Sequence, residues 1–388
     1  MKKLRPMLII IIAFVTLLTL PGCWSAKGLS SLAIVTGIGI DKGASLDQLL
    51  LTIQIVKPSQ AQVPSSEGGK SRGKAFWNAT CAGETMIGAI REVTHLIGKE
   101  PFLAHSNVII FGNDFATTGV KKTLDFFLRN PETQPTALIL VASGRAGDIL
   151  NVESEAEILP VQNIIKIIKG AAAISQFKVI TINDFANNLM SKTTAPIAPL
   201  VSITQNGNRQ NIYVSGLAVF KKDKLVGALN DMETRGLLWT TGDVKKGLIL
   251  ITSPEDTGNV AFEISKSKSK VTPEIKAGRV IIHIEVRTET NLVEQTSADK
   301  IYFPVVALLE ERQAEVIRQE IMAAFDKSAE LSADIFGFGD IVYKRFPAQW
   351  QSLEDHWDEV YPRIDLVLDI KVTMRETGLV TQPVSPEK

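Results

Sequence analysis

Hydrophobic positions along the chain begin with a single apolar run close to the first residue. Residues 7–20 are almost entirely apolar and follow three basic residues within the first five positions. About 20 apolar residues are needed to span a bilayer, whereas about 7–15 form the core of an export signal. The run leads to Gly22 and Cys23, which resemble the end of a bacterial lipobox. We therefore predict a lipoprotein signal peptide over residues 1–22 and acylation of Cys23; the alternative is an uncleaved transmembrane anchor.

Beyond this leader, the apolar positions alternate between a period of two residues and a helical period. The segment Lys57–Lys74 interrupts the pattern with Pro, Ser and Gly, so it is predicted to be an exposed loop. Alternation of strands and helices favours a mixed sheet covered by helices. The predicted strands are Leu32–Ile40, Leu49–Val56, Asn107–Phe111 and Thr136–Ala142, and the predicted helices are Glu84–Ile97, Gly119–Arg129, Ala156–Lys169 and Asn183–Lys192.

In the second half, strands dominate and one long helix interrupts them. The helix is predicted over Val306–Glu330, where apolar residues form a stripe along one face. The pattern favours an antiparallel sheet packed on this helix, and the fold class of the whole chain is α+β. The predicted strands are Ile212–Phe220, Leu225–Ala228, Leu248–Thr252, Val260–Lys266, Arg279–Thr288 and Ile364–Thr373.

Chain length allows two or three domains of about 150 residues each. Pro196 and Pro199 interrupt regular structure, so a boundary is predicted near Pro199–Gln210. We expect an N-terminal α+β region over residues 23–200, which two subdomains would also fit. A C-terminal α+β domain is predicted over residues 210–376, and a flexible tail over residues 377–388.

Charge and cysteine content limit the classes of partner and of cross-link. Lys+Arg and Asp+Glu both number 42, and removing the three leader cations leaves a balance of about −3. A nucleic-acid partner would require a basic face, so none is expected. If Cys23 carries lipid, Cys81 remains alone and no intramolecular disulfide can form.

Catalytic and metal-binding motifs give no positive signal. Gly69–Ser71 resembles the end of a phosphate-binding loop, but Pro64 replaces the glycine that such a loop needs. The four histidines form no H-x-x-x-H pair, and no G-x-S-x-G motif is present, although a triad from distant segments remains open. We expect no enzyme activity, no cofactor and no metal. Three tryptophans are interpreted as core residues, with an aromatic binding cleft as the alternative: Trp239, Trp350 and Trp357.

The order of several short motifs resembles the Ger(x)C family of spore germination lipoproteins, the C subunits of nutrient germinant receptors. The resemblance extends over nearly the whole chain. Its motifs are Gly22–Trp24, Ile34–Asp41, His105 with Val108–Gly112, Leu124–Phe126 with Arg129 and Glu132, Gly216–Phe220, Lys224–Gly227, Glu233–Trp239, Ala333–Gly339, and Pro347 with Trp350 and Trp357.

This resemblance implies a lipid-anchored subunit on the outer face of the spore's inner membrane. There it would assemble with two integral-membrane subunits, a multi-pass A-type and a transporter-like B-type, and would have no enzymatic activity. The alternative from another class is an extracytoplasmic lipoprotein that binds a small nutrient ligand directly.

Polar residues within the matched motifs are the candidate interaction residues, because an apolar core does not require them. The alternative is that they form hydrogen bonds or ion pairs within their own domain; Arg129 and Glu132, for example, could form an ion network with Arg91. The candidates are Asp41, Arg129, Glu132, Glu233 and Arg235.

Overall fold

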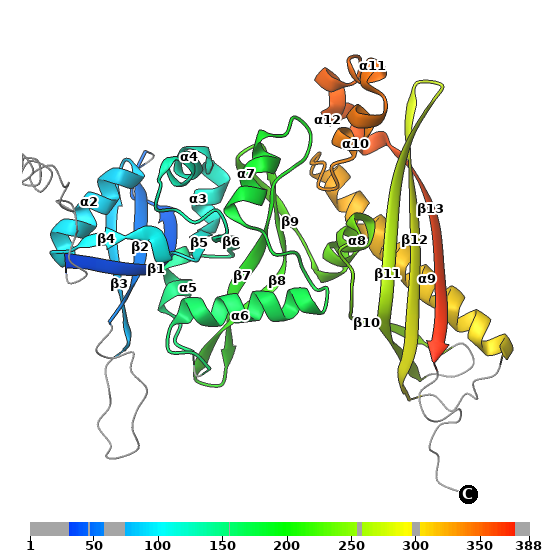
Figure 1. Cartoon of the computed structure of the whole chain (residues 1–388), viewed down its shortest axis with the longest axis horizontal. Helices are drawn as coiled ribbons and strands as arrows, with labels where there is room; N and C mark the ends of the chain where they lie inside the picture. Colours follow the sequence, from blue (N-terminus) through cyan, green and yellow to red (C-terminus); the bar gives the residue numbers. More distant parts are fainter. Residues whose placement is uncertain are drawn as a thin grey trace, which may run out of the picture.

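The computed structural model describes residues 31–45, 47–57, 74–154, 156–253, 258–296 and 303–376. The predicted signal peptide, Cys23, most of the predicted loop and the predicted tail therefore lie outside the described residues. Within these ranges the chain forms two sheets, which lie side by side along the longest axis of the molecule (Figure 1).

The larger sheet has nine strands within the described residues, in the order β3-β2-β1-β5-β6-β7-β8-β9, with β4 paired to β1. Strands β1 and β2 form the antiparallel hairpin that the sequence predicts, and β1, β5, β6 and β7 run parallel to one another. The strands are β1 Leu32–Lys42, β2 Leu49–Val56, β3 Phe76–Gly83, β4 Glu100–Phe102, β5 Val108–Phe111, β6 Leu138–Ala142, β7 Ile197–Asn206, β8 Arg209–Lys221 and β9 Lys224–Leu229.

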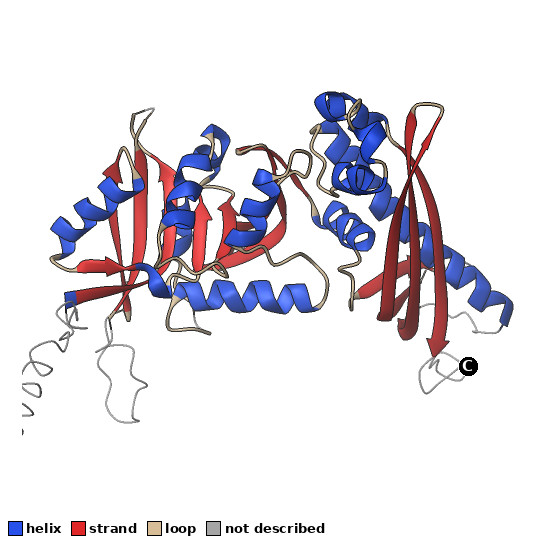
Figure 2. Ribbon diagram, turned by 45° about the horizontal axis from the view of Figure 1, so that its top comes forward, coloured by secondary structure: helices blue, strands red, loops and turns tan. Residues whose placement is uncertain are grey.

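Helices pack on both faces of this sheet, as expected for a sheet with a parallel core (Figure 2). Successive residues of β1 alternate between these faces: Gly37 and Gly39 approach α5 and α6, while Ile38 and Ile40 are buried on the other side. The helices are α2 Met86–Ile97, α3 Asn113–Thr118, α4 Lys121–Arg129, α5 Ala146–Asn151, α6 Pro160–Ala173 and α7 Ile182–Met190. Helix α6 begins later than predicted because Pro160, which lacks an N–H, occupies its first turn.

The smaller sheet has the order β10-β11-β12-β13, and the long helix α9 packs against it. The prediction of a wholly antiparallel sheet is wrong in one strand, because β13 runs parallel to β12. Parallel neighbours require a crossover connection, and α9 with the short helices after it provides one. The elements are β10 Leu248–Thr252, β11 Asn259–Lys276, β12 Arg279–Gln295, α9 Phe303–Glu330 and β13 Asp365–Glu376.

Helix α8, Asp231–Thr241, lies between the two sheets and packs on α9 (Figure 1). A second link joins the segment before β7 to the segment after α9: the N–H of Ala195 donates to the carbonyl of Asp334 at 2.8 Å. Three short helices follow that segment: α10 Phe338–Arg345, α11 Pro347–Trp350 and α12 Trp357–Val360. The predicted boundary near residues 199–210 coincides with the β7–β8 hairpin, whose strands pair within the larger sheet. The division into domains stays a prediction.

Candidate interaction surfaces

Asp41, the first candidate interaction residue, is buried at the end of β1. Its two carboxylate oxygens accept the backbone N–H groups of Ala146 at 2.7 Å and Gly147 at 2.9 Å. These N–H groups belong to the first turn of α5, where helix N–H groups have no partner within the helix. Burial raises the pKa of Asp41, and the two backbone hydrogen bonds act in the opposite direction. Asp41 thus caps a helix of its own domain, which favours the intradomain alternative for this residue.

Arg129 lies on the surface at the end of α4, where its side chain is 79% exposed and its guanidinium pairs with Asp125 one turn earlier. The carboxylate of Glu132, in contrast, accepts the backbone N–H of Leu103 at 3.1 Å. The two side chains therefore have different partners, and the ion pair between them that the sequence suggested is not formed. Of the pair, Arg129 is the one free to meet a partner.

A groove of about 1100 Å³ lies beside Arg129. It is bordered by the β1–β2 turn, the start of α2, the end of α3, and α4. Apolar side chains, among them Met86, Phe115 and Phe126, lie between charged groups of both signs such as Lys122 and Asp125. Such a mixture suits either a segment of another protein or a small amphipathic molecule.

Glu233 and Arg235 lie in the first turns of α8. Glu233 forms a capping box with Asn230: each side chain accepts the backbone N–H of the other residue, at 2.7 and 2.9 Å. Arg235 lies 3.3 Å from Glu320 of α9 and donates to the carbonyl of Leu248 at 2.7 Å. Both candidates are thus engaged within the fold.

Glu320 is a buried carboxylate that the sequence reasoning missed. Besides Arg235, it accepts the indole N–H of Trp239 at 2.6 Å. Burial raises the pKa of Glu320, while Arg235 and Trp239 act to lower it. The local sequence gives one sign that Glu320 is buried: it lies within the apolar stripe of α9, four residues before Ala324 and one before Ile321. Its role depends on α8, which is distant in the sequence.

Asp334 was also missed, although it lies in the matched motif Ala333–Gly339. Its carboxylate accepts the backbone N–H groups of Phe338 and Gly339 at the start of α10, and the indole N–H of Trp357. Trp239, Trp350 and Trp357 are all buried, which confirms the interpretation of these residues as core.

Within the described ranges, no group of three or more His, Cys, Asp or Glu side chains could hold a metal ion. None of the helices described there combines the length and the apolar character needed to cross a membrane. Cys81 is a free thiol of intermediate exposure in β3. Cys23 lies outside the described residues, so its acylation stays a prediction.

Comparison with known families gives matches to both halves of the chain. A family model described as "Spore germination protein N-terminal domain" matches residues 25–203. A second, described as "Spore germination B3/ GerAC like, C-terminal", matches residues 215–378.

Individual relatives from Bacillus subtilis (strain 168) match along nearly their whole length. Spore germination protein B3 is 27% identical, with 95% of this chain and 97% of the relative covered. Spore germination protein KC is 25% identical with 98% of each covered, and the putative spore germination protein YfkR is 26% identical with 99% and 98% covered. The crystal structure of the GerBC protein has a similar fold, with a TM-score of 0.58 and 23% identity over 87% of this chain and 96% of that one.

Proposed function

Because the chain belongs to the Ger(x)C family of spore germination proteins, we propose that it is the lipid-anchored C subunit of a nutrient germinant receptor. In this proposal Cys23 carries the lipid, and the subunit lies on the outer face of the spore's inner membrane. It assembles there with an A-type and a B-type integral-membrane subunit. The observation that carries the proposal is the pair of family matches, which together extend over nearly all of the chain after the leader.

A non-catalytic role is supported by the way the fold uses its buried carboxylates. Asp41 and Asp334 accept backbone N–H groups at helix starts, and Glu320 accepts hydrogen bonds from side chains of α8. These groups hold elements together and face other parts of the same chain. In this proposal the protein is needed for assembly of the receptor or for the signalling that triggers germination, and it catalyses no reaction.

The groove beside Arg129 is the surface that we assign to a receptor subunit. Of the five candidate residues, Arg129 is the most clearly solvent-facing, and the groove beside it exposes Ile87, which is 49% exposed. Exposed apolar side chains with charged neighbours are typical of protein interfaces. Asp41, Glu132, Glu233 and Arg235 then support the fold on which this surface is built.

Mass spectrometry of the mature N-terminus tests the anchor directly. We expect a chain that begins at an acylated Cys23, and loss of membrane attachment and of the germination response in Cys23→Ala spores. Acyl chains contribute about 0.8 kcal/mol per buried CH₂ to membrane binding. An unmodified Cys23 in the wild-type protein would contradict the lipid anchor.

Direct binding of a small nutrient is the second candidate function, and the volume of the same groove favours it. Ligand pockets commonly measure about 300–1,000 Å³, and the groove is of that order. Equilibrium binding of amino acids and sugars to the purified chain distinguishes the two functions. Saturable binding that Arg129→Glu abolishes would favour the nutrient receptor, and absence of binding would favour the assembly role.

A further inference from the structure

The outer face of the smaller sheet carries a row of three cations that cross three neighbouring strands. Lys268 of β11 pairs in register with Arg287 of β12, which pairs in register with Lys371 of β13. All three point away from α9, because alternate residues such as Val286 and Val372 are buried on the opposite face. Like charges placed directly opposite on adjacent strands are destabilising. The row therefore depends on negative groups from the neighbouring rows or from a ligand.

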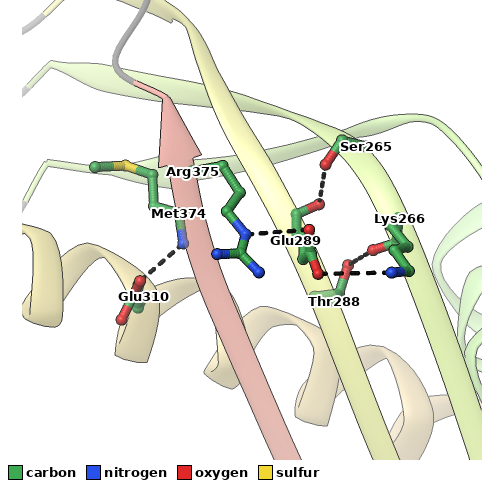
Figure 3. Close-up of polar contacts among 7 residues, drawn as sticks. All are labelled: Ser265, Lys266, Thr288, Glu289, Glu310, Met374 and Arg375. Atoms are coloured by element: carbon green, nitrogen blue, oxygen red, sulfur yellow. Dashed lines mark hydrogen bonds and ion pairs between the residues drawn. The ribbon is translucent and has the colours of Figure 1, made fainter.

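The rows on either side contain acidic residues, and their carboxylates are already paired. Glu289 is held between Lys266, at 3.9 Å, and Arg375, at 3.1 Å (Figure 3). Figure 3 shows that Glu289 occupies the middle strand, with the cations on the two strands beside it. On the other side of the row of three cations, Arg287 pairs with Glu285 and Asp369.

The two lysines of the row lack a direct ion pair, although the charge of Lys371 contributes to the lowered pKa of Asp369, whose main cause is the hydrogen bond from Arg287. Neither Lys268 nor Lys371 forms an ion pair with the described residues. A hollow of about 160 Å³ lies over the paired strands at this point, and its charged lining consists of four cationic side chains and one carboxylate: Lys266, Lys268, Arg287 and Lys371, with Glu289. A hollow of this size and charge suits one compact oxyanion, such as a phosphoryl group.

Exposed aliphatic side chains accompany these cations on the same face. Leu248 and Leu250 of the edge strand β10 are 54% and 59% exposed, whereas their neighbours Ile249 and Ile251 are buried toward α9. On β13, Val367 is 46% exposed. Basic residues together with exposed aliphatic ones are the composition of surfaces that lie at an anionic membrane interface.

We propose that this face of the smaller sheet binds the phosphodiester headgroup of an anionic phospholipid, with Lys268, Arg287 and Lys371 as the ligands of the phosphate. This contact rests on the membrane attachment in the proposed function and adds a second point of contact, in the half of the chain opposite the anchor. The row would hold the subunit in one orientation on the membrane surface.

The test uses the full acylated chain bound to vesicles and measures how fast each lysine reacts with a water-soluble amine reagent. Vesicles contain either phosphatidylglycerol with phosphatidylcholine or phosphatidylcholine alone. We expect slower modification of Lys268 and Lys371 on the phosphatidylglycerol vesicles only. Lys344, which is exposed on α10 away from the sheet face, should react equally on both. Salt at about 1 M, where the Debye length is about 3 Å, should remove the protection.

A variant pair sharpens the test. In Lys371→Gln the protection of Lys268 should fall about fivefold, because each basic residue near an anionic surface contributes a factor of that order. The matched control Lys344→Gln should leave it unchanged.

Equal protection on both vesicle types, or none on either, would overturn the headgroup contact. Equal protection by inorganic phosphate in detergent would also overturn it, since the site would then serve a free anion. Failure of the chain to float with either vesicle type would overturn both this contact and the anchor, whereas flotation with unprotected lysines would overturn only the contact.

Discussion

The indole N–H of Trp357 donates a hydrogen bond to Oδ2 of Asp334 across 3.1 Å. The same carboxylate accepts the backbone N–H groups of Phe338 at 3.0 Å and Gly339 at 2.8 Å. One buried side chain thus joins the segment after α9 to the start of α10 and to α12. The backbone carbonyl of Asp334 also accepts the N–H of Ala195, so this residue connects the two sheets.

Asp334→Ala should therefore destabilise the protein by about 2–4 kcal/mol, because three buried donors would lose their acceptor. Urea denaturation of the purified chain measures the change in the free energy of unfolding. The matched control is Asp358→Ala: the Asp358 side chain is 65% exposed, and its carboxylate pairs with Lys221 at the surface. The control should change stability by less than about 1 kcal/mol. Equal effects of the two substitutions would contradict the bridging role.

The pH dependence of stability should contain a contribution from Asp334. Burial raises the pKa of its carboxyl group from 3.8 to about 6, although the hydrogen bonds from Gly339, Phe338 and Trp357 act to lower it. Between these two pH values the folded state binds more protons than the unfolded state, so this contribution is fully present below pH 3.8 and is lost as the pH rises through 6.

The stability difference between wild type and Asp334→Ala isolates this contribution from other titrating groups. We expect Asp334→Ala to destabilise the protein more at acidic than at neutral pH, by up to about 3 kcal/mol. A difference that grows with pH would mean that the hydrogen bonds, rather than burial, dominate the pKa of Asp334.

Gly236→Ala should separate α8 from α9. A Cβ atom at Gly236 would lie 1.9 Å from the carbonyl oxygen of Glu320 and 2.5 Å from its carbon, and backbone atoms of a long helix cannot move aside locally. We expect a loss of about 3 kcal/mol or more, seen in thermal unfolding and in the fluorescence of Trp239. Gly170→Ala in α6 is the matched control: a Cβ there meets nothing within 4 Å, so the change should be neutral or stabilise by up to about 1 kcal/mol.

Asp41→Ala should destabilise the larger sheet by about 2 kcal/mol, because the first N–H groups of α5 would be left buried without an acceptor. Gly112→Ala should reproduce part of the effect, since its Cβ would lie 2.0 Å from Oδ1 of Asp41. Asp47→Ala, in the exposed β1–β2 turn, is the control and should change stability by less than about 0.5 kcal/mol. Thermal melts compare the three. A stable Asp41→Ala protein that failed to assemble would restore Asp41 as an interaction residue.

Charge reversal at two arginines distinguishes a residue that stabilises the fold from one that contacts a partner. Arg235→Glu would place two carboxylates together beside Trp239, and should cost about 3–5 kcal/mol because Glu320 would lose its cation. Arg129→Glu changes an exposed group, so the purified chain should melt like wild type while copurification of the membrane subunits from spores falls.

Arg91→Glu, an exposed substitution on α2, controls for the change in net charge. Normal assembly of Arg129→Glu would exclude the groove as the contact with the membrane subunits. Early melting of that variant would instead mean that Arg129 is structural.

The parts of the fold that could be predicted are those that depend on residues close together in the sequence. The β-branched residues of Leu32–Ile40 and Leu49–Val56 predicted β1 and β2, and the apolar stripe of Val306–Glu330 predicted α9, because these signals lie within each segment itself. The order of short motifs likewise predicted the family. The direction of β13 was not predictable in this way, because it depends on where the helices after β12 return the chain.

The sequence by itself determined which segments bury a face, and with which period. Only the tertiary structure decided what each polar residue meets. Asp41 comes directly after a predicted strand, where a polar residue is expected at the surface. Its hydrogen-bond partner Ala146 lies 105 positions later in the chain. Arg235 likewise finds Glu320 only once α8 packs on α9. Hydrophobic burial follows from a residue's own neighbours along the chain, whereas a hydrogen bond requires a partner whose position is known only after the whole chain has closed on itself.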